Sequence, residues 1–194
     1  MANGTNGVKR PKATRESLED QLVTVFKKRG YEGATLNQLA EATGLGKASL
    51  YHHFPGGKAE MAAVLLRQAV ARLQKSAFSR LRKSAPAATR LRLFVDGFSA
   101  YTDDGESQCL VAILAQGSAR EVHGESISRQ FQDWTATLTS VFEETGCKPR
   151  RAQRLAADLL ARLYGALLTA QLLGDPQHFR ASIKRIKKSL PETP

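Results

Sequence analysis

The chain has 194 residues, of which 42% are hydrophobic and 24% are charged, so a packed globular protein is expected and wholesale disorder is excluded. It carries 29 Lys and Arg against 18 Asp and Glu, and this net charge of +11 favours a polyanionic partner such as nucleic acid. No run of about 18 apolar residues predicts a membrane-spanning helix, and the N-terminus without an apolar stretch predicts a cytoplasmic protein.

The N-terminal part of the chain begins with a segment that has no apolar period. Residues 1–13 are rich in Gly, Asn, Lys and Pro, which predicts a flexible basic arm. Apolar residues at helical spacing follow Thr14, a candidate N-cap, and Gly30 is expected to stop this first helix.

Two short helices are predicted next, with a glycine turn between them. Thr35 and Gln38 have the Thr-x-x-Gln pattern of a capping box, and Gly44 can take the left-handed conformation that closes a helix. The third helix is expected from about residue 47 to 54, with Leu50 and Phe54 inward at i and i+4.

This pair of short helices has the properties of a helix-turn-helix DNA reader. A recognition helix in the major groove needs small or polar outward residues near its N-terminus, which here are Lys47, Ala48 and Ser49. Phosphate contacts are expected from hydroxyl, imidazole, ammonium or backbone N–H groups of Thr35, Tyr51, His52 and Lys58. From composition alone, a plain helical hairpin in a bundle remains an equal alternative.

The remainder of the chain also has helical periodicity. No glycine or proline interrupts residues 58–83, which predict one long helix, and Pro86 separates it from an aromatic-rich helix. A short apolar helix is expected at 109–119, followed by helices at 126–145 and 150–173 and a last one over 179–190. Because no segment alternates with the period of a strand, the predicted fold class is all-α.

Aromatic side chains on several of these helices are the candidates for an effector site, since pockets between helices bind small apolar ligands. An ordinary aromatic core is the alternative. Cys109 opens an apolar segment and is a candidate for redox sensing or for inert packing. The ligand-binding candidates are Phe78, Phe94, Phe98, Tyr101, Cys109, Trp134 and Tyr164.

The helix predicted over 150–173 has an apolar face wider than one core contact needs, which favours a partner subunit. The last helix has a similar apolar stripe. The dimerisation candidates on these two helices are Leu159, Leu163, Leu167, Phe179, Ile183 and Ile186.

The segment from Arg67 to Arg92 contains eight basic residues and no acidic one. It predicts either a second polyanion surface or a pocket for an anionic effector, or the solvated face of a long helix whose aliphatic stems cover apolar neighbours.

Other chemistries lack the residues they need. The Gly44-Leu-Gly-Lys-Ala-Ser stretch has Glu41 and Ala48 where a phosphate-binding loop needs Gly and a hydroxyl residue. His52 and His53 are adjacent and cannot chelate one metal as an i, i+4 pair can, and two cysteines are too few for a typical zinc site. No nucleophile-elbow pattern is visible, so no catalytic residue, metal or cofactor is expected.

The sequence TLNQLAEATGLGKASLYHHF at residues 35–54 resembles the DNA-binding domain of the TetR family of bacterial regulators, in which T-x-x-x-[IL]-A-x-x-x-G-[VL] leads into L-Y-x-H-F. This resemblance covers residues 14–66. The QCLVA stretch at 108–112, the YGALL stretch at 164–168 and the GDP stretch at 174–176 resemble the C-terminal domain of the LmrA and YxaF subgroup.

The resemblance implies a helix-turn-helix domain at residues 14–60 and a helical effector-binding and dimerisation domain at 61–194. It implies a homodimeric repressor of a palindromic double-stranded DNA operator, released by a small-molecule effector. Two other classes stay open: a helical small-molecule-binding protein or enzyme without sequence-specific DNA binding, and a general basic DNA-coating protein.

Overall fold

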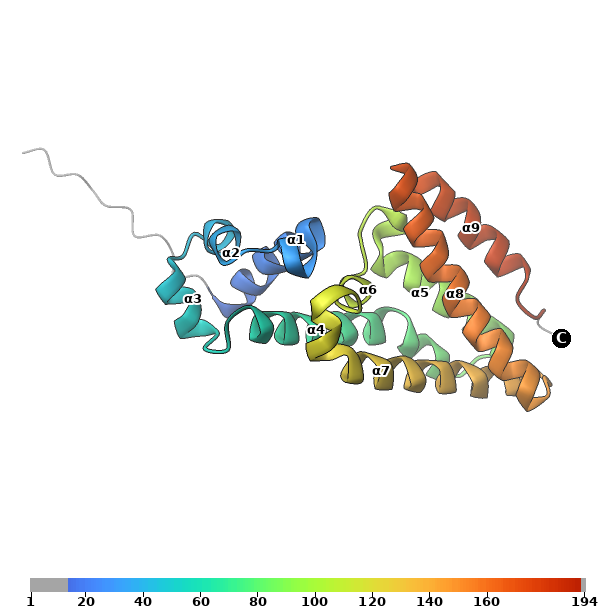
Figure 1. Ribbon diagram of the computed structural model, residues 1–194. Helices are drawn as coiled ribbons and strands as arrows, with labels where there is room; N and C mark the ends of the chain where they lie inside the picture. Colours follow the sequence, from blue (N-terminus) through green and yellow to red (C-terminus); the bar gives the residue numbers. More distant parts are fainter. Residues whose placement is uncertain (1–13, 193–194) are drawn as a thin grey trace, which may run out of the picture.

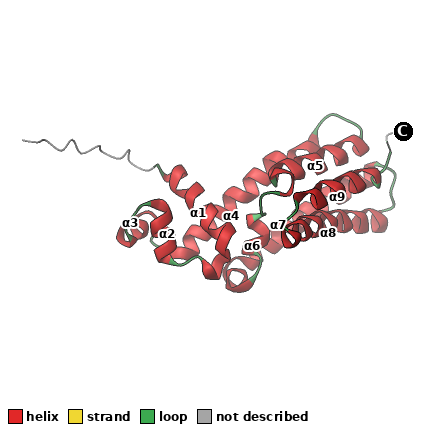
Figure 2. Cartoon of the chain, turned by 90° about the horizontal axis from the view of Figure 1, so that it is seen from above, coloured by secondary structure: helices red, strands yellow, loops and turns green. Residues whose placement is uncertain are grey.

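The computed structural model describes residues 14–192, and all the regular elements within that range are helices (Figures 1 and 2). The predicted all-α class is confirmed, and the arm expected at residues 1–13 lies outside the described residues. The helices are α1 (Arg15–Gly33), α2 (Leu36–Thr43), α3 (Lys47–His53), α4 (Gly57–Ser76), α5 (Ala87–Tyr101), α6 (Leu110–Leu114), α7 (Gly117–Glu144), α8 (Pro149–Leu173) and α9 (Pro176–Lys188), with 3₁₀ turns η1 (Phe78–Arg82) and η2 (Asp103–Gly105).

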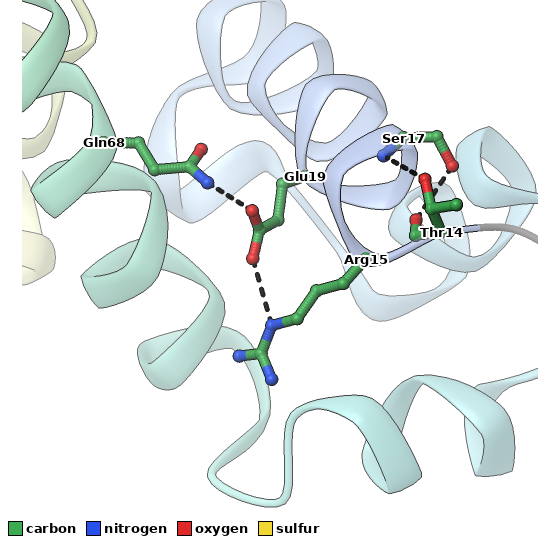
Figure 3. Close-up of polar contacts among 5 residues, drawn as sticks. All are labelled: Thr14, Arg15, Ser17, Glu19 and Gln68. Atoms are coloured by element: carbon green, nitrogen blue, oxygen red, sulfur yellow. Dashed lines mark hydrogen bonds and ion pairs between the residues drawn. The ribbon is translucent and has the colours of Figure 1, made fainter.

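Helices α1 to α3 gather at one end of the molecule and α5 to α9 form a bundle at the other, while α4 extends from the first group into the second (Figure 1). Thr14 caps α1 by accepting a hydrogen bond from the Ser17 backbone N–H, as Figure 3 shows. The expected stop at Gly30 is a kink, where φ is 69°, and the helix continues to Gly33.

Helix α4 ends earlier than the sequence predicts. It stops at Ser76, and the expectation of one helix through residue 83 is wrong. At this point α5 approaches closely: a Cβ added to Gly97 would lie 2.2 Å from the Ser76 carbonyl oxygen. The Ser76 hydroxyl also donates a 2.8 Å hydrogen bond to the Gly97 carbonyl, so the chain turns where the two helices touch.

Helix α7 begins at Gly117, nine residues before the predicted start at 126, and the short helix expected over 109–119 ends at Leu114. The first turn of α7 contacts the N-terminal helices. The Glu32 carboxylate accepts hydrogen bonds from the Ser118 backbone N–H at 2.5 Å and from its hydroxyl at 2.9 Å. A carboxylate at a helix N-terminus is favourable because the free N–H groups there carry partial positive charge.

A buried carboxylate joins α1 to α4 on the other side of this contact region. Glu19 is 5% exposed, and it accepts hydrogen bonds from Arg15 Nε at 3.1 Å and from the Gln68 amide (Figure 3). Arg72 on α4 pairs with Asp20 at 2.8 Å. The N-terminal helices are therefore held to the bundle by polar contacts on two sides as well as by the core that continues through both groups.

Helix α8 is, among residues 14–192, the one helix long and apolar enough to cross a membrane by length and composition. No such helix is predicted from the length of the apolar runs in the sequence. A core helix of a soluble protein passes the same test, and α8 packs against both α7 and α9.

Candidate nucleic-acid interface

The turn between α2 and α3 has the geometry that its residues predict. Thr35 and Gln38 form the expected capping box: the Thr35 hydroxyl accepts from the Gln38 N–H, and the Gln38 side chain accepts from the Thr35 N–H. Gly44 closes α2 at φ 64°, and the Leu45 N–H reaches back to the Ala40 carbonyl at 3.1 Å. The chain is thereby redirected within three residues before α3 begins.

Helix α3 is oriented by two apolar side chains. Leu50 and Phe54 are fully buried, as predicted, and the Arg15 guanidinium lies 5.2 Å from the centre of the Phe54 ring. The first three residues of α3, Lys47, Ala48 and Ser49, are all exposed. One cationic, one small and one hydroxyl side chain therefore lie next to one another in the exposed first turn of α3. Side chains of these types can contact base edges in the major groove.

The phosphate candidates lie around this helix. Tyr51 is 45% exposed and His52 is exposed beside it. The Tyr51 ring packs against Gly57, where a Cβ would lie 3.3 Å from a ring carbon. Thr35 is exposed at the start of α2, and its hydroxyl already accepts a capping bond. These groups remain predicted DNA contacts.

Lys58 has a contact that the sequence did not reveal. Its ammonium donates a 3.0 Å hydrogen bond to the Tyr31 carbonyl and lies 4.5 Å from the centre of the Tyr31 ring. Lys58 thus joins α4 to the end of α1. Because an ammonium has three N–H donors, the expected phosphate contact stays a prediction alongside this positioning role.

The aromatic residues predicted to bind an effector do come together, but they pack on one another. Phe78 stacks on Trp134 with ring centres 4.9 Å apart, Phe94 meets Phe78 edge to face at 4.9 Å, and Phe98 meets Tyr164 at 5.3 Å. The buried Trp134 Nε1 has no hydrogen-bond partner within the described residues. These side chains form an aromatic core, the alternative to an effector site that the sequence also allows.

Cys109 lies at the edge of that core, 2% exposed, and its thiol donates to the Tyr164 hydroxyl at 3.8 Å. Burial raises the pKa of the Cys109 thiol. Burial, together with the hydrogen bond to Cys109, also raises the pKa values of Tyr101 and Tyr164. Because a neutral buried thiol is a poor nucleophile, Cys109 has the properties of packing and not of a redox sensor.

Four of the eight basic residues from Arg67 to Arg92 have partners within the described residues, among them Arg72 with its ion pair to Asp20. Arg80 donates to the Ser76 carbonyl at 2.6 Å, Arg90 donates to the Leu81 carbonyl at 2.8 Å and pairs with Glu144, and Arg92 donates to the Ala88 carbonyl. Half of the run is therefore structural, whereas Arg67, Lys75, Arg82 and Lys83 are exposed.

The prediction that six residues of α8 and α9 form the dimer interface needs correction. Leu159, Leu163 and Leu167 are 0–3% exposed in the single chain, and the three candidates on α9, Phe179, Ile183 and Ile186, are 0–7% exposed. They fill the protomer's own core between α7, α8 and α9, and so cannot form a partner surface. The exposed apolar residues of α8 are instead Leu168, Leu172 and Leu173.

A cavity of about 250 Å³ lies between α4, α6 and α7. None of the aromatic candidates lines it. Its lining residues are Ala63, Leu66, Arg67 and Val70 of α4, Val111 of α6, and His123, Ser126, Ile127 and Gln130 of α7. The polar lining residues of α7, His123, Ser126 and Gln130, have the spacing i, i+3 and i+7, which places them on one face of the helix. This spacing is the feature of the sequence from which their grouping could have been predicted.

A helix-turn-helix with an exposed second helix, joined through a shared helix to a larger helical bundle, defines a DNA-binding transcription regulator. The family model for bacterial regulatory proteins of the tetR family matches residues 20–65, and the model for the C-terminal domain of LmrA/YxaF-like transcriptional regulators matches residues 87–185. The chain belongs to the TetR family, in its LmrA/YxaF-like group.

Known proteins agree with this assignment. The HTH-type transcriptional regulator LmrA of Bacillus subtilis (strain 168) is 25% identical over 159 residues, which cover 80% of this chain and 85% of LmrA. A TetR regulator from Legionella pneumophila has a similar fold with a TM-score of 0.76 at 17% identity, over 94% of this chain and 100% of the other. AibR, solved with isovaleryl coenzyme A and operator DNA, has a similar fold with a TM-score of 0.61 at 17% identity. The match covers 77% of this chain and 85% of AibR.

Proposed function

We propose that the chain is a cytoplasmic homodimeric repressor that binds a palindromic operator and is released by a small-molecule effector. The exposed start of α3, held in place by the buried Leu50 and Phe54, carries this proposal. Lys47, Ala48 and Ser49 face base edges in the major groove, while Thr35, Tyr51, His52 and Lys58 contact phosphates. Two subunits present two such helices to the two halves of the operator.

The DNA-reading domain extends over residues 14–60 and the effector and dimerisation domain over 61–194. This boundary falls inside α4 (Gly57–Ser76), which belongs to both domains. A displacement of the C-terminal end of α4 is therefore transmitted through this continuous helix to the DNA-binding domain. The displacement changes the separation of the two α3 helices in the dimer.

The proposed dimer surface is the outer face of α8. Leu168, Leu172 and Leu173 are 57%, 79% and 57% exposed there, which is unusual for leucine in a monomer. The exposed small residues Ala157, Ala161 and Gly165 lie on the same face one turn apart, which allows a second helix to approach closely.

Replacing Leu172 by Glu is expected to convert the homodimer to a monomer at micromolar concentration, because two symmetry-related carboxylates would be buried without partners. Analytical ultracentrifugation measures the change. The matched control is Val122→Glu on α7, since Val122 is 58% exposed on another helix and its replacement should leave the dimer intact. A Leu172→Glu protein that stays dimeric would remove α8 from the interface.

The proposed effector site is the cavity between α4, α6 and α7. It borders the helix that both domains share, and its walls combine five apolar and four polar or charged residues, so that an apolar ligand with polar groups could be held and oriented there. AibR has been solved with isovaleryl coenzyme A and operator DNA, which supports a fold that can bind both a small molecule and DNA.

The direct test is selection of genomic fragments bound by the purified protein, followed by competition between the selected site and bulk DNA at fixed salt. We expect a palindromic site preferred at least about a thousandfold. Equal affinity for bulk DNA would indicate a general DNA-coating protein. A protein that binds no DNA in a clean preparation would be a small-molecule-binding bundle, and the proposal would fail.

A further inference from the structure

A cleft lined by cationic side chains lies at the end of the molecule opposite α3. It has a volume of about 840 Å³ and is formed by the turn between α7 and α8, the first part of α8 and the residues that follow α9. Figure 1 shows the α7–α8 turn and the end of α9 far from the helix-turn-helix. Neither the predicted DNA contacts nor the residues of the cavity between α4, α6 and α7 line this cleft, so the proposed function makes no use of it.

The charges around the cleft are strongly unbalanced. One lining residue, Asp158, is acidic. The basic lining residues are Lys148, Arg150, Arg151, Arg154 and Arg162, and all of them are exposed. Within residues 14–192, no carboxylate forms an ion pair with any of these basic residues. At the end of α7, Glu144 pairs with Arg90 and Glu143 lines a separate groove. Most of the positive charge of the cleft therefore has no counter-charge.

An anion bound in this cleft would be stabilised by the cations around it. Like charges around a concave surface repel one another, and an anion between them replaces this repulsion by attraction. Arg162 donates a 2.8 Å hydrogen bond to the Ser189 hydroxyl, and both residues belong to the lining. Because a guanidinium has five N–H donors, Arg162 keeps donors for a ligand while this bond holds it in the cleft.

The residue types and the shape of the cleft indicate the kind of anion. Guanidinium groups form paired, charge-assisted hydrogen bonds with phosphate oxygens, and several of them around one cleft match a ligand with several phosphate charges. A volume of about 840 Å³ is in the range of small-molecule sites. A DNA duplex is instead read by an element that projects into its groove, which a concave surface does not do.

We infer that this cleft binds a small molecule with two or more phosphate groups, held by Lys148 and the arginines of the first part of α8. The inference does not rest on the proposed function. It assigns a ligand class to a part of the chain that neither DNA reading nor the effector cavity involves.

The test uses ATP and adenosine, which share the base and the sugar and differ in the triphosphate. Each is titrated into the full-length protein by calorimetry at fixed salt without divalent cations. We expect one ATP per chain, and adenosine at least about a hundredfold weaker because it lacks the charged hydrogen bonds of the phosphates. Lys148→Gln combined with Arg151→Gln is expected to weaken ATP binding at least about tenfold. Both side chains are exposed and neither belongs to the surface proposed for dimerisation.

The matched control is Lys28→Gln combined with Arg29→Gln, which removes the same charge from exposed residues of α1. It should change the affinity for ATP by less than about twofold, because salt screens charges that are distant from the cleft. Circular dichroism and analytical ultracentrifugation check that each variant keeps its helices and its oligomeric state. Absence of ATP binding at millimolar concentration, equal binding of adenosine, or an equal loss in the two double variants would each overturn the inference.

Binding of operator and of bulk DNA is measured on the same preparations. If the Lys148 and Arg151 replacements weaken binding of bulk DNA and leave ATP binding unchanged, the cleft contacts nucleic acid and the inference fails. A protein that binds ATP in the cleft but binds no operator would refute the proposed function alone. A protein that binds its operator but not ATP would refute only the phosphate site.

Discussion

Replacing Lys47 and Tyr51 together by alanine is expected to weaken operator binding about a hundredfold while the fold and the dimer persist. Both side chains are exposed at α3, so their removal leaves the core formed by Leu50 and Phe54 intact. Two polar contacts at about 1.4 kcal/mol each correspond to this factor. Fluorescence anisotropy on a labelled operator at fixed salt measures it.

The salt dependence gives a second readout of the same variant. Because the slope of log affinity against log salt follows the Lys and Arg charges brought to the DNA, the loss of Lys47 should lower it by up to about 0.9, and the loss of the neutral Tyr51 hydroxyl should leave it unchanged. Lys184→Ala is the control, because it removes one exposed positive charge from α9, far from α3 along the chain. If Lys184→Ala weakens binding as much as the double replacement does, the general charge of the protein and not α3 accounts for DNA binding.

The largest effect on stability is expected from Gly97→Ala, which should lower the free energy of unfolding by about 3 kcal/mol or more. The new Cβ would lie 2.2 Å from the Ser76 carbonyl oxygen and 2.7 Å from the Ala77 Cα. Both are backbone atoms, so no side-chain rotation relieves the contact and α5 must move away from α4. Urea unfolding followed by circular dichroism measures the change.

Gly33→Ala is the matched control for this replacement. Gly33 ends α1, its φ is not positive, and a Cβ there would meet only the Arg29 Cβ at 3.4 Å, an ordinary contact. Its replacement should change stability by no more than about 0.5 kcal/mol. A Gly97→Ala protein as stable as Gly33→Ala would contradict the close approach of α5 to the end of α4.

The helix-turn-helix formed by α2 and α3 could be predicted from the sequence because local interactions determine its structure. The Thr35–Gln38 capping box, the left-handed Gly44 and the inward pair Leu50 and Phe54 each depend on residues within a few positions of one another. Propensity, capping and periodicity agree in this segment, and the structure follows them.

The parts that the sequence did not predict depend on contacts between distant segments. Residues 58–83 have no helix breaker, yet α4 ends at Ser76, where Gly97 of α5 lies against it. Similarly, periodicity identified the apolar faces of α8 and α9, but periodicity does not reveal whether a face packs inside its own protomer or against a partner. His123 is a lone histidine in the sequence, and its cavity exists only after α4, α6 and α7 have packed together.

Two of the polar contacts between α1 and the rest of the molecule differ in how easily water can replace them. The Glu19 carboxylate, between Arg15 and Gln68, is buried, whereas the contact of Glu32 with Ser118 is exposed, so water can take over the hydrogen bonds of Glu32 at little cost. The joint between α1 and the rest of the molecule therefore combines one polar contact that is costly to expose with another that water can replace at little cost.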